Sequence, residues 1–368
     1  MEFLSKLLLF LSTFVFSVLS VRGVGVLASK KGWFDIPNRR SSHKTPTPRM
    51  GGAAFIPIVL GGVGVSWMGG DLPLSLRSVF FCAAIALYGV GLIDDWRSCS
   101  RAIRMVIHLF SATAFLAVAA HAWRSGEART PSDLARIFSP PSPGFWLLAI
   151  WIIGFLNIYN FMDGIDGIAG LQAIVAGIGW TVIAGHAGAR GTAVLAACLA
   201  AGALGFLTMN WPPARIFMGD AGSTVIGFIL AVLPLLLVLE SNSESDLDRY
   251  LLAASLVVWP FLADGAFTIV RRIGNGENIL EPHCSHLYQR LVGSGAHPFL
   301  VTSIYGALAV SGCGWAWLVI SRAAYARIGA TLWIAIAFSI LWRWVVMRER
   351  AVEAKNGMPK NAVALRGK

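Results

Sequence analysis

Long apolar runs separated by short polar segments make up most of the chain. Most runs contain about 20 residues, the length at which a helix rising about 1.5 Å per residue crosses about 30 Å of hydrocarbon. The runs lack the alternation of apolar and polar residues that strands of a transmembrane barrel show. The pattern therefore predicts an all-α integral membrane protein, a polytopic helical bundle of about eleven transmembrane helices, with ten as the alternative. The expected spans are residues 3–28, 50–68, 76–93, 103–120, 144–161, 166–185, 191–209, 222–239, 250–270, 298–320 and 325–347.

The composition agrees with this fold class. The chain has 368 residues, of which 56% are hydrophobic and 13% are charged, whereas an ordinary soluble domain is about 45–50% apolar and about 25% charged. The low charge excludes a disordered protein, a coiled coil and a conventional soluble enzyme. None of the five cysteines forms a CxxC pair. We therefore expect free thiols or small apolar side chains rather than disulfides or zinc ligands.

The loops differ in their content of basic residues, and this difference predicts the topology. Most of the 30 Lys and Arg residues fall in one alternate set of loops and in the C-terminal tail. The positive-inside rule places this set in the cytoplasm, so the N-terminus is expected outside and the C-terminus inside. The net charge of +11 then reflects topology and phosphate handling, and no nucleic-acid partner is expected. The predicted organisation is a single polytopic domain in the lipid bilayer over residues 1–348, followed by a basic cytoplasmic tail over residues 349–368.

Five carboxylates carry the strongest functional signal. All lie at the cytoplasmic ends of expected spans, where like charges repel and resist burial unless cations or hydrogen bonds accompany them. Mg²⁺ suits such a place, because one or two carboxylates hold it while waters and substrate phosphates complete its shell. The alternative is that each Asp only caps a helix or ends a span. The five acids are Asp94, Asp95, Asp163, Asp166 and Asp220.

The segment Asn157–Gly167 ends the fifth expected span and combines amides with carboxylates. Residues three apart share a helix face, so Asn157, Asn160 and Asp163 are expected to line one stripe. The glycines that follow allow the backbone to turn and to approach a ligand closely. This arrangement suits a sugar, a base edge or a metal ion. The alternative is that the two Asn side chains bond to neighbouring helices.

Two other acidic segments lie at span ends. Asp94 and Asp95 are adjacent, and adjacent helical side chains point about 100° apart, so at most one faces the site squarely. The other would bind metal through water or orient Arg97 or Arg101. Asp220 opens the eighth span among glycines, where free N–H groups at a helix start favour a phosphate beside a metal bound to the acid. A plain capping turn is the alternative for this segment.

Two basic loops are candidates for binding anions. The loop that contains His283, His286 and Arg290 has too few well-spaced ligands for zinc, but His and Arg together suit pyrophosphate or nucleotide. The alternative is a solvated basic loop. The loop that contains Lys44 and Arg49 interleaves basic residues with Pro, Thr and Gly. It is therefore expected to be a shaped loop rather than only a topology signal.

One acid lies deeper than the others. Asp264 is placed about two turns inside the ninth expected span. Arg271 follows seven residues later, on roughly the same helix face. We expect the two side chains to form a structural ion pair.

Taken together, these segments resemble one family, the polyprenyl-phosphate N-acetylhexosamine-1-phosphate transferases of glycosyltransferase family 4. Each motif is weak alone, but the combination is specific and covers nearly all of the spans. Within the family the chain looks most like the branch that starts bacterial O-antigen, and its His loop departs from the His-rich cluster of the muramoyl-pentapeptide branch. The motifs that carry the resemblance are Pro46–Gly52, Gly91–Asp95, Asn157–Gly167, Phe217–Ser223, Ser41–Arg49 and His286–Leu291.

The resemblance implies a reaction and its partners. Undecaprenyl phosphate attacks the sugar-bound phosphorus of a UDP-N-acetylhexosamine, with a 6-deoxy form among the candidates, and UMP leaves. The product starts O-antigen or another cell-envelope polysaccharide. The implied cofactor is Mg²⁺, with Mn²⁺ as an alternative, and a homodimer is among the implied assemblies. The implied location is the bacterial inner membrane, with the active site facing the cytoplasm.

The resemblance also implies roles for the candidate residues. The Mg²⁺ ligands would be Asp220 and Asn160. Asp94 would be the base on the lipid phosphate, with Asp95 near the metal. Because a phosphate monoester already ionises at about pH 6, whether the reaction needs a base is left open. Phe217 would stack on the nucleotide. The other contacts to the nucleotide sugar would come from Asn157, Asp163, Asp166, His283, His286 and Arg290, and the lipid phosphate would meet Lys44 and Arg49.

Two other classes compete with this interpretation. A secondary transporter would bind near the middle of the membrane with broken helices in paired halves, but here the acids crowd one face. A CDP-alcohol phosphotransferase would need Asp-Gly followed by Ala-Arg and two further spaced Asp residues. The residues after Asp163 do not supply that pattern.

Overall fold

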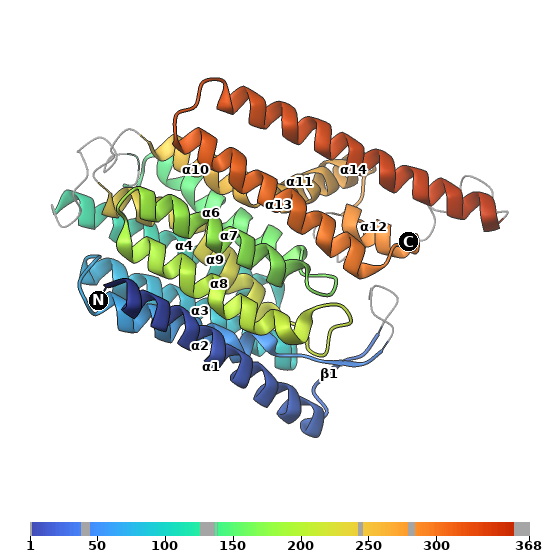
Figure 1. The fold of residues 1–368 in the computed structure, drawn as a ribbon, viewed down its shortest axis with the longest axis horizontal. Coiled ribbons are helices and arrows are strands. Elements are labelled where there is room, and N and C mark those ends of the chain that lie inside the picture. Colours follow the sequence, from blue (N-terminus) through green and yellow to red (C-terminus); the bar gives the residue numbers. More distant parts are fainter. Residues whose placement is uncertain are drawn as a thin grey trace.

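The computed structural model describes residues 2–37, 45–125, 137, 139–241, 246–278 and 284–356. In this part of the chain the long helices run side by side as a bundle (Figure 1). Its β-structure is one antiparallel pair of two-residue strands. The elements are α1 (Glu2–Lys31), β1 (Phe34–Asp35), β2 (Thr47–Pro48), α2 (Gly51–Trp67), α3 (Leu74–Arg97), α4 (Arg101–Arg124), α6 (Pro143–Phe161), α7 (Ile168–His186), α8 (Arg190–Asn210), α9 (Asp220–Glu240), α10 (Leu247–Val257), α11 (Trp259–Gly274), α12 (Leu287–Gly293), α13 (Pro298–Ile320) and α14 (Ala326–Asn356).

The helices confirm the all-α polytopic membrane fold. Within the described residues, nine helices are long and apolar enough to cross a membrane, and α10 together with α11 forms a tenth candidate. The run expected as the second span, residues 50–68, forms α2, which is apolar but has only 17 residues. The Gly- and Ala-rich runs expected as the sixth and seventh spans form α7 and α8, of 19 and 21 residues. The orientation of the bundle in the membrane stays a prediction.

The run expected as the ninth span, residues 250–270, is not one continuous helix. The axes of α10 and α11 differ by 81°, and Val258 lies between the two helices. Pro260 occupies the first turn of α11. A proline has no N–H, and its ring clashes with the preceding turn, so it can begin a helix but disrupts one that should continue. The ninth expected span is therefore present as a broken helix pair, and α11 contacts α12 and α13.

The centre of the bundle is α9 (Figure 1). Every residue from Ala221 to Leu239 is buried, and the helix contacts α2, α3, α6 and α10 among its neighbours. A helix that is apolar on all sides is stable only when other elements cover every side. The packing of α9 therefore fixes the position of Asp220, its first residue, relative to the surrounding helices.

Glycines let the backbones of two segments come into contact with the backbone at the start of α9. A Cβ on Gly91 of α3 would lie 2.6 Å from both the Cα and the N atom of Ala221, and a Cβ on Gly52 of α2 would overlap the backbone of Gly222. The Gly52 N–H also donates to the Met218 carbonyl at 2.7 Å. Segments far apart in the sequence thus meet through backbone contacts that a side chain would block.

The close approach at Gly91 predicts a difference between two alanine substitutions in the same helix. Gly91→Ala should destabilise the protein by about 1–3 kcal/mol, because the new methyl group forces α3 away from α9. Gly89→Ala is the control, because a Cβ there meets nothing within 4 Å and should be neutral or stabilising by up to about 1 kcal/mol. Thermal unfolding in detergent, followed by circular dichroism, measures both, and equal midpoints would contradict the packing described for Gly91.

Candidate active site

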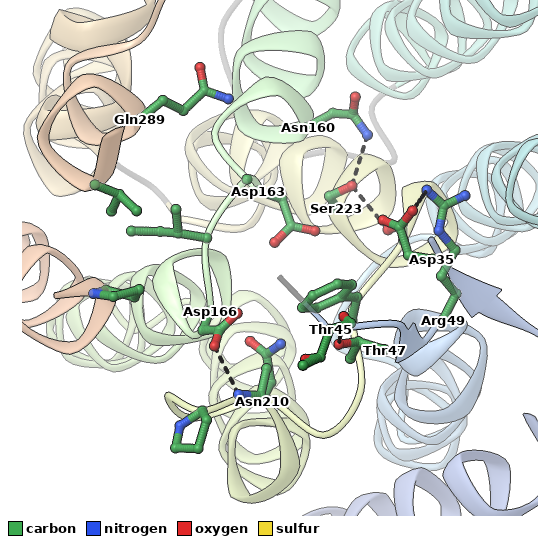
Figure 2. Close-up of a pocket in the computed structure, with 18 of the residues that line it drawn as sticks. Asp35, Thr45, Thr47, Arg49, Asn160, Asp163, Asp166, Asn210, Ser223 and Gln289 are labelled. Carbon is green, nitrogen blue, oxygen red and sulfur yellow. Dashed lines mark hydrogen bonds and ion pairs between the residues drawn. The ribbon is translucent and has the colours of Figure 1, made fainter. Parts of the chain in front are cut away.

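A cavity of about 680 Å³ lies at the end of the bundle where α3 and α6 end and α9 begins (Figure 2). Its wall also includes residues of β1, β2 and α12. The polar side chains that surround it come from segments up to about 260 residues apart in the chain. Among the described residues, Arg49 is the only Lys or Arg in the lining. The acids of the lining are Asp35, Asp94, Asp95, Asp163, Asp166 and Asp220.

The Asp95 carboxylate caps the first turn of α9. Its oxygens accept the N–H groups of Asp220 at 2.8 Å and Ala221 at 3.2 Å. The residue before the helix, Gly219, has a φ of 78°, a left-handed conformation that glycine adopts without strain. A Cβ there would also lie 2.5 Å from the Asp95 carboxylate. The capping interaction thus brings α3 and α9 together at the cavity, and the negative charge suits the positive end of the α9 dipole.

The neighbouring Asp94 points to a different partner, as expected for adjacent helical residues. One of its oxygens accepts the Cys99 N–H at 2.6 Å, and the other lies 3.1 Å from Nη1 of Arg104. The same Arg104 nitrogen donates to Asp220 at 2.6 Å. Arg104 therefore bridges two of the candidate acids and offsets part of their charge.

Sequence reasoning missed Arg104 and expected Arg97 or Arg101 to take this place. The Arg97 guanidinium instead lies over the ring of Trp96, 4.7 Å from its centroid. The short turn between α3 and α4 reverses the chain, so the first turn of α4 packs back beside Asp94. The sequence feature that could have indicated Arg104 is its i, i+3 spacing from Arg101 at the start of that helix. The direction of the turn between α3 and α4 decided which arginine meets the acids.

The loop after α6, residues 162–167, carries the other two acids. Asp166 accepts the Ala214 N–H at 2.9 Å, which joins this loop to the segment before α9. The Asp163 carboxylate points toward the middle of the cavity in Figure 2. Among the described residues, none donates a hydrogen bond to it. Burial and the nearby carboxylates of Asp220, Asp95 and Asp166 raise the pKa of Asp163 to about 7.

The oxygen atoms around Asp163 and Asp220 are the best candidates for holding a metal ion. Asn160 lies beside them, and its amide nitrogen donates to the Ser223 hydroxyl at 2.8 Å. The amide oxygen points away from Asp163 in Figure 2, so the amide would have to turn over to bind a metal ion through oxygen. In the described part of the chain, no group of three or more His, Cys, Asp and Glu side chains converges as a complete metal site. Carboxylate and amide oxygens suit Mg²⁺, which commonly takes one or two protein ligands and completes its shell with water and substrate phosphates. The donor set fits that kind of incomplete site.

Comparison with known proteins identifies the family of this chain. The sequence profile of glycosyl transferase family 4 matches residues 77–238. A probable undecaprenyl-phosphate N-acetylglucosaminyl 1-phosphate transferase of Bacillus subtilis is 30% identical over 286 residues, which cover 76% of this chain and 75% of the relative. A decaprenyl-phosphate N-acetylglucosaminephosphotransferase of Mycobacterium tuberculosis is 31% identical over 313 residues, 77% of this chain and 74% of the relative.

The chain belongs to glycosyl transferase family 4.

The comparisons do not assign the chain to a branch of family 4. A phospho-N-acetylmuramoyl-pentapeptide-transferase of a Synechococcus strain is 34% identical over 259 residues, which cover 62% of this chain and 66% of the relative. The relatives named here therefore include N-acetylglucosamine-phosphate enzymes as well as a muramoyl-pentapeptide enzyme. The O-antigen branch stays a prediction.

The structure brings most of the expected family 4 site residues to the cavity but places three of them elsewhere. Asn157 donates to the Ile153 carbonyl at 2.7 Å, within its own helix, and does not line the cavity. Its amide lies 3.4 Å from the ring of His108 on α4. It thus contacts a neighbouring helix, which was the alternative interpretation of the Asn residues in this segment.

The two basic candidates near α12 that the structure describes also have other partners. His286 is 3% exposed, and its Nδ1 lies 3.2 Å from Asp264. Arg290 makes two hydrogen bonds to Glu349 of α14, at 2.8 and 2.6 Å. Neither residue lines the cavity, because both point into the packing between helices. A direct contact of these side chains with a nucleotide sugar therefore has no support in this geometry.

The remaining candidates divide between the cavity and the part of the chain that is not described. Lys44 and His283 lie outside the described residues. Arg49 and Phe217 both line the cavity, and Arg49 pairs with Asp35 at 2.9 Å. Gln289 of α12 lines it as well. This residue lies inside the His286–Leu291 motif, but no role was predicted for it.

The raised pKa of Asp163 predicts a pH dependence of stability. Without divalent cations, the folded protein keeps a proton on Asp163 up to a pKa of about 7, whereas the unfolded chain loses it near the ordinary value of 3.8. The free energy of unfolding should therefore fall as pH rises from about 4 to about 7. Asp163→Asn should flatten this part of the profile, whereas Asp71→Asn, an exposed acid at the opposite end of the bundle, should not.

Unfolding by denaturant in EDTA across this pH range measures the slope. Because other carboxylates contribute to the profile, the informative quantity is the difference in slope between each variant and the wild type. Identical slopes for the wild type and Asp163→Asn would contradict the environment described for Asp163.

Proposed function

We propose that the protein transfers an N-acetylhexosamine 1-phosphate from a UDP-sugar to a polyprenyl phosphate and releases UMP. The observation that carries this proposal is the cluster of carboxylates that converges on one cavity at the end of an apolar helical bundle. The names of two relatives, from Bacillus subtilis and Mycobacterium tuberculosis, support a polyprenyl-phosphate acceptor and favour N-acetylglucosamine as the sugar. Undecaprenyl phosphate is the proposed acceptor, and a 6-deoxy sugar is the alternative donor.

The charge of the cavity explains why a divalent cation belongs to this proposal. Six of the described residues that line the cavity are aspartates, so a diphosphate would be repelled unless a cation neutralised them. Mg²⁺ bound by Asp163, Asp220 and Asn160 would supply that neutralisation and polarise the diphosphate, and Mn²⁺ is the alternative. The Asp163 carboxylate is the available ligand, because no described residue donates a hydrogen bond to it.

The residues of the chain would act mainly by positioning and by controlling charge, as phosphoryl transfer requires. Phe217 would stack on the uracil ring, and Arg49 would bind the phosphate of the lipid. Asp94, held by Arg104 at 3.1 Å, would orient the attacking oxygen. That oxygen forms a bond to the sugar-bound phosphorus, the bond from this phosphorus to the UMP oxygen breaks, and UMP carries away the electron pair.

The capping residue Asp95 takes a different role in this scheme. Both of its oxygens already accept backbone N–H groups of α9. It would therefore hold Asp220 in place rather than accept a proton from the substrate. Asp94 also accepts one backbone N–H, from Cys99, but its other oxygen contacts the side chain of Arg104. We therefore propose Asp94 rather than Asp95 for contact with the reacting phosphate.

The proposed place of the reaction follows from the topology. The cavity lies at the end of the bundle to which the positive-inside rule assigns the basic loops, so it would face the cytoplasm. We propose the bacterial inner membrane as the location and the start of O-antigen or another cell-envelope polysaccharide as the pathway step. The polyprenyl chain would remain in the bilayer while its phosphate reaches the cavity.

Substitution of the central acids tests the function. Asp220→Ala and Asp94→Ala should each lower UMP release from UDP-sugar and undecaprenyl phosphate by about 10³-fold or more, because charge placement supplies most of the catalysis. Asp71→Ala, at the opposite end of the bundle, should keep wild-type turnover. UMP release is measured with purified protein in detergent, with Mg²⁺ or EDTA, and with UDP-GlcNAc, UDP-GalNAc and their 6-deoxy relatives in turn.

The outcomes of this assay separate the parts of the proposal. Turnover of no donor by the wild-type protein would overturn the proposed function. Wild-type turnover by Asp220→Ala would overturn the assignment of the metal site, and full activity in EDTA would overturn the requirement for a cation. Both alanine variants must be shown to insert in the membrane and to elute as the wild type does in size-exclusion chromatography.

A further inference from the structure

A buried carboxylate outside the cavity holds together three helices near it. Asp264 of α11 is 0% exposed and lies a little more than one turn after the break between α10 and α11. One of its oxygens accepts the Leu287 N–H at 2.9 Å, and the other accepts the Tyr288 N–H at 3.3 Å and the Tyr305 hydroxyl at 2.6 Å. The expected ion pair with Arg271 is wrong, because that guanidinium donates to the Ser285 carbonyl at 3.3 Å instead.

Two more side chains complete the surroundings of this carboxylate. The Thr268 hydroxyl donates to it at 3.2 Å from the next turn of α11, and Nδ1 of His286 lies at 3.2 Å. A carboxylate offers about four acceptor sites, so these contacts satisfy it fully. Such an arrangement offsets the cost of burying the acid, and it ties α11 to both α12 and α13.

The helix that Asp264 holds, α12, cannot be stable by itself. It has only 7 residues, and isolated helices shorter than about 12 residues are marginal in water. Its first N–H groups are the ones that bond to Asp264. The same helix places Gln289 and Val292 in the wall of the cavity. The position of that wall therefore depends on the buried acid.

A second contact runs from α12 to the loop that carries Asp163. The Tyr288 hydroxyl donates to the Phe161 carbonyl at 3.0 Å and occupies the space that a Cβ on Gly164 would need. Burial, and then the carboxylates of Asp264 and Asp163, raise the pKa of Tyr288 well above its ordinary value. The hydroxyl is therefore protonated at neutral pH and remains a donor.

The helix α13 supports the same loop from another side. Thr302 and Tyr305 are three residues apart and share a helix face. Thr302 donates to the Asp166 carbonyl at 2.7 Å, while Tyr305 donates to Asp264. The buried acid and the acidic loop of the cavity are thus both bonded to one face of α13.

We propose that Asp264 is a positioning residue for the transfer reaction: by holding the start of α12 and the face of α13, it sets the place of Gln289 and of the Asp163 loop. This inference rests on the proposed function in one respect, which is the identity of the reaction that Asp264 serves. Asp264 is not among the residues that line the cavity. It acts through Tyr288, Tyr305 and the backbone of α12.

The chain offers a matched control for a purely structural role. Asp246, at the N-terminus of α10, is 9% exposed. It pairs with Arg249 at 2.6 Å and with Arg322, which follows α13, at 3.0 Å. It therefore also joins the α10–α11 region to α13, but at the end of the bundle away from the cavity. Its loss should destabilise the protein without moving the Asp163 loop.

Kinetics provide the first test. At a temperature where all variants are folded, Asp264→Asn should lower kcat for UMP release by about 10- to 100-fold, the loss expected when a reacting group is misplaced by about 1 Å. The KM for polyprenyl phosphate should stay within about twofold, because Arg49 lies on the opposite side of the cavity from Gln289 (Figure 2). Tyr305→Phe, which removes only one hydrogen bond, should act in the same direction with a smaller loss. Asp246→Asn should lower the unfolding temperature and leave kcat unchanged.

A double-mutant cycle tests whether the path runs through Tyr288. If Asp264 acts through the Tyr288 hydroxyl, the losses in kcat of Asp264→Asn and Tyr288→Phe should be less than additive when combined. The losses of Asp246→Asn and Tyr288→Phe should simply add. Additive losses for the first pair would overturn the path through Tyr288.

Hydrogen–deuterium exchange tests the positioning without any catalytic readout. Asp264→Asn and Tyr305→Phe should speed exchange in residues 284–293 and in residues 162–167, whereas Asp246→Asn should speed it only near residues 246–257. Unchanged exchange in residues 162–167, or an Asp246→Asn profile like that of Asp264→Asn, would overturn the proposal. If the wild type releases no UMP, the proposed function fails, and the exchange pattern still decides whether Asp264 positions the loop.

Discussion

The structure depends on carboxylates that cap the starts of helices from a neighbouring element. A buried helix N-terminus leaves N–H groups that no water can reach, and an unsatisfied group there costs about 1–3 kcal/mol. Asp95 of α3 caps α9, and Asp264 of α11 caps α12. Glu240 caps α8 at the other end of the bundle, where it accepts the N–H groups of Gly191 at 2.6 Å and Thr192 at 2.9 Å. Each cap satisfies the orphan donors and also joins helices that are distant in the sequence.

This constraint gives the acids of the cavity unequal roles. Asp95 and Asp166 accept backbone N–H groups and hold the segments around α9 in place. Arg104 bridges Asp94 and Asp220, and the Asp163 carboxylate accepts no hydrogen bond from the described residues. Asp95 and Asp166 position the backbone around the cavity, and the other acids face its open space. There a cation and a diphosphate would supply the partners that these other carboxylates lack. Carboxylates that hold the backbone and carboxylates that we propose to act in the reaction are thus neighbours in the same motifs.

Much of the fold and the acids at the centre of the candidate site could be predicted from local patterns. The partners of the residues at the edge of the site could not. Apolar runs of span length identified the long helices, and glycines beside acids identified the cavity. Asn157 and Arg290 lie in motifs that predicted contacts to the substrate, yet they bond to Ile153 and Glu349 in the packing between helices. A spacing pattern shows which side chains share a face, but it does not show whether that face meets a cavity or another helix.

The sequence by itself determined the membrane class, the number of apolar helices to within one or two, and the acids that gather at one end. These properties depend on hydrophobicity and on the period of the helix, which are local. Only the tertiary structure decided that Pro260 breaks the ninth expected span by 81°, that Arg104 reaches the acids, and that Asp264 serves α12 instead of Arg271. These outcomes depend on the direction in which helices meet, because a buried polar group takes whichever partner the packing brings within hydrogen-bond distance.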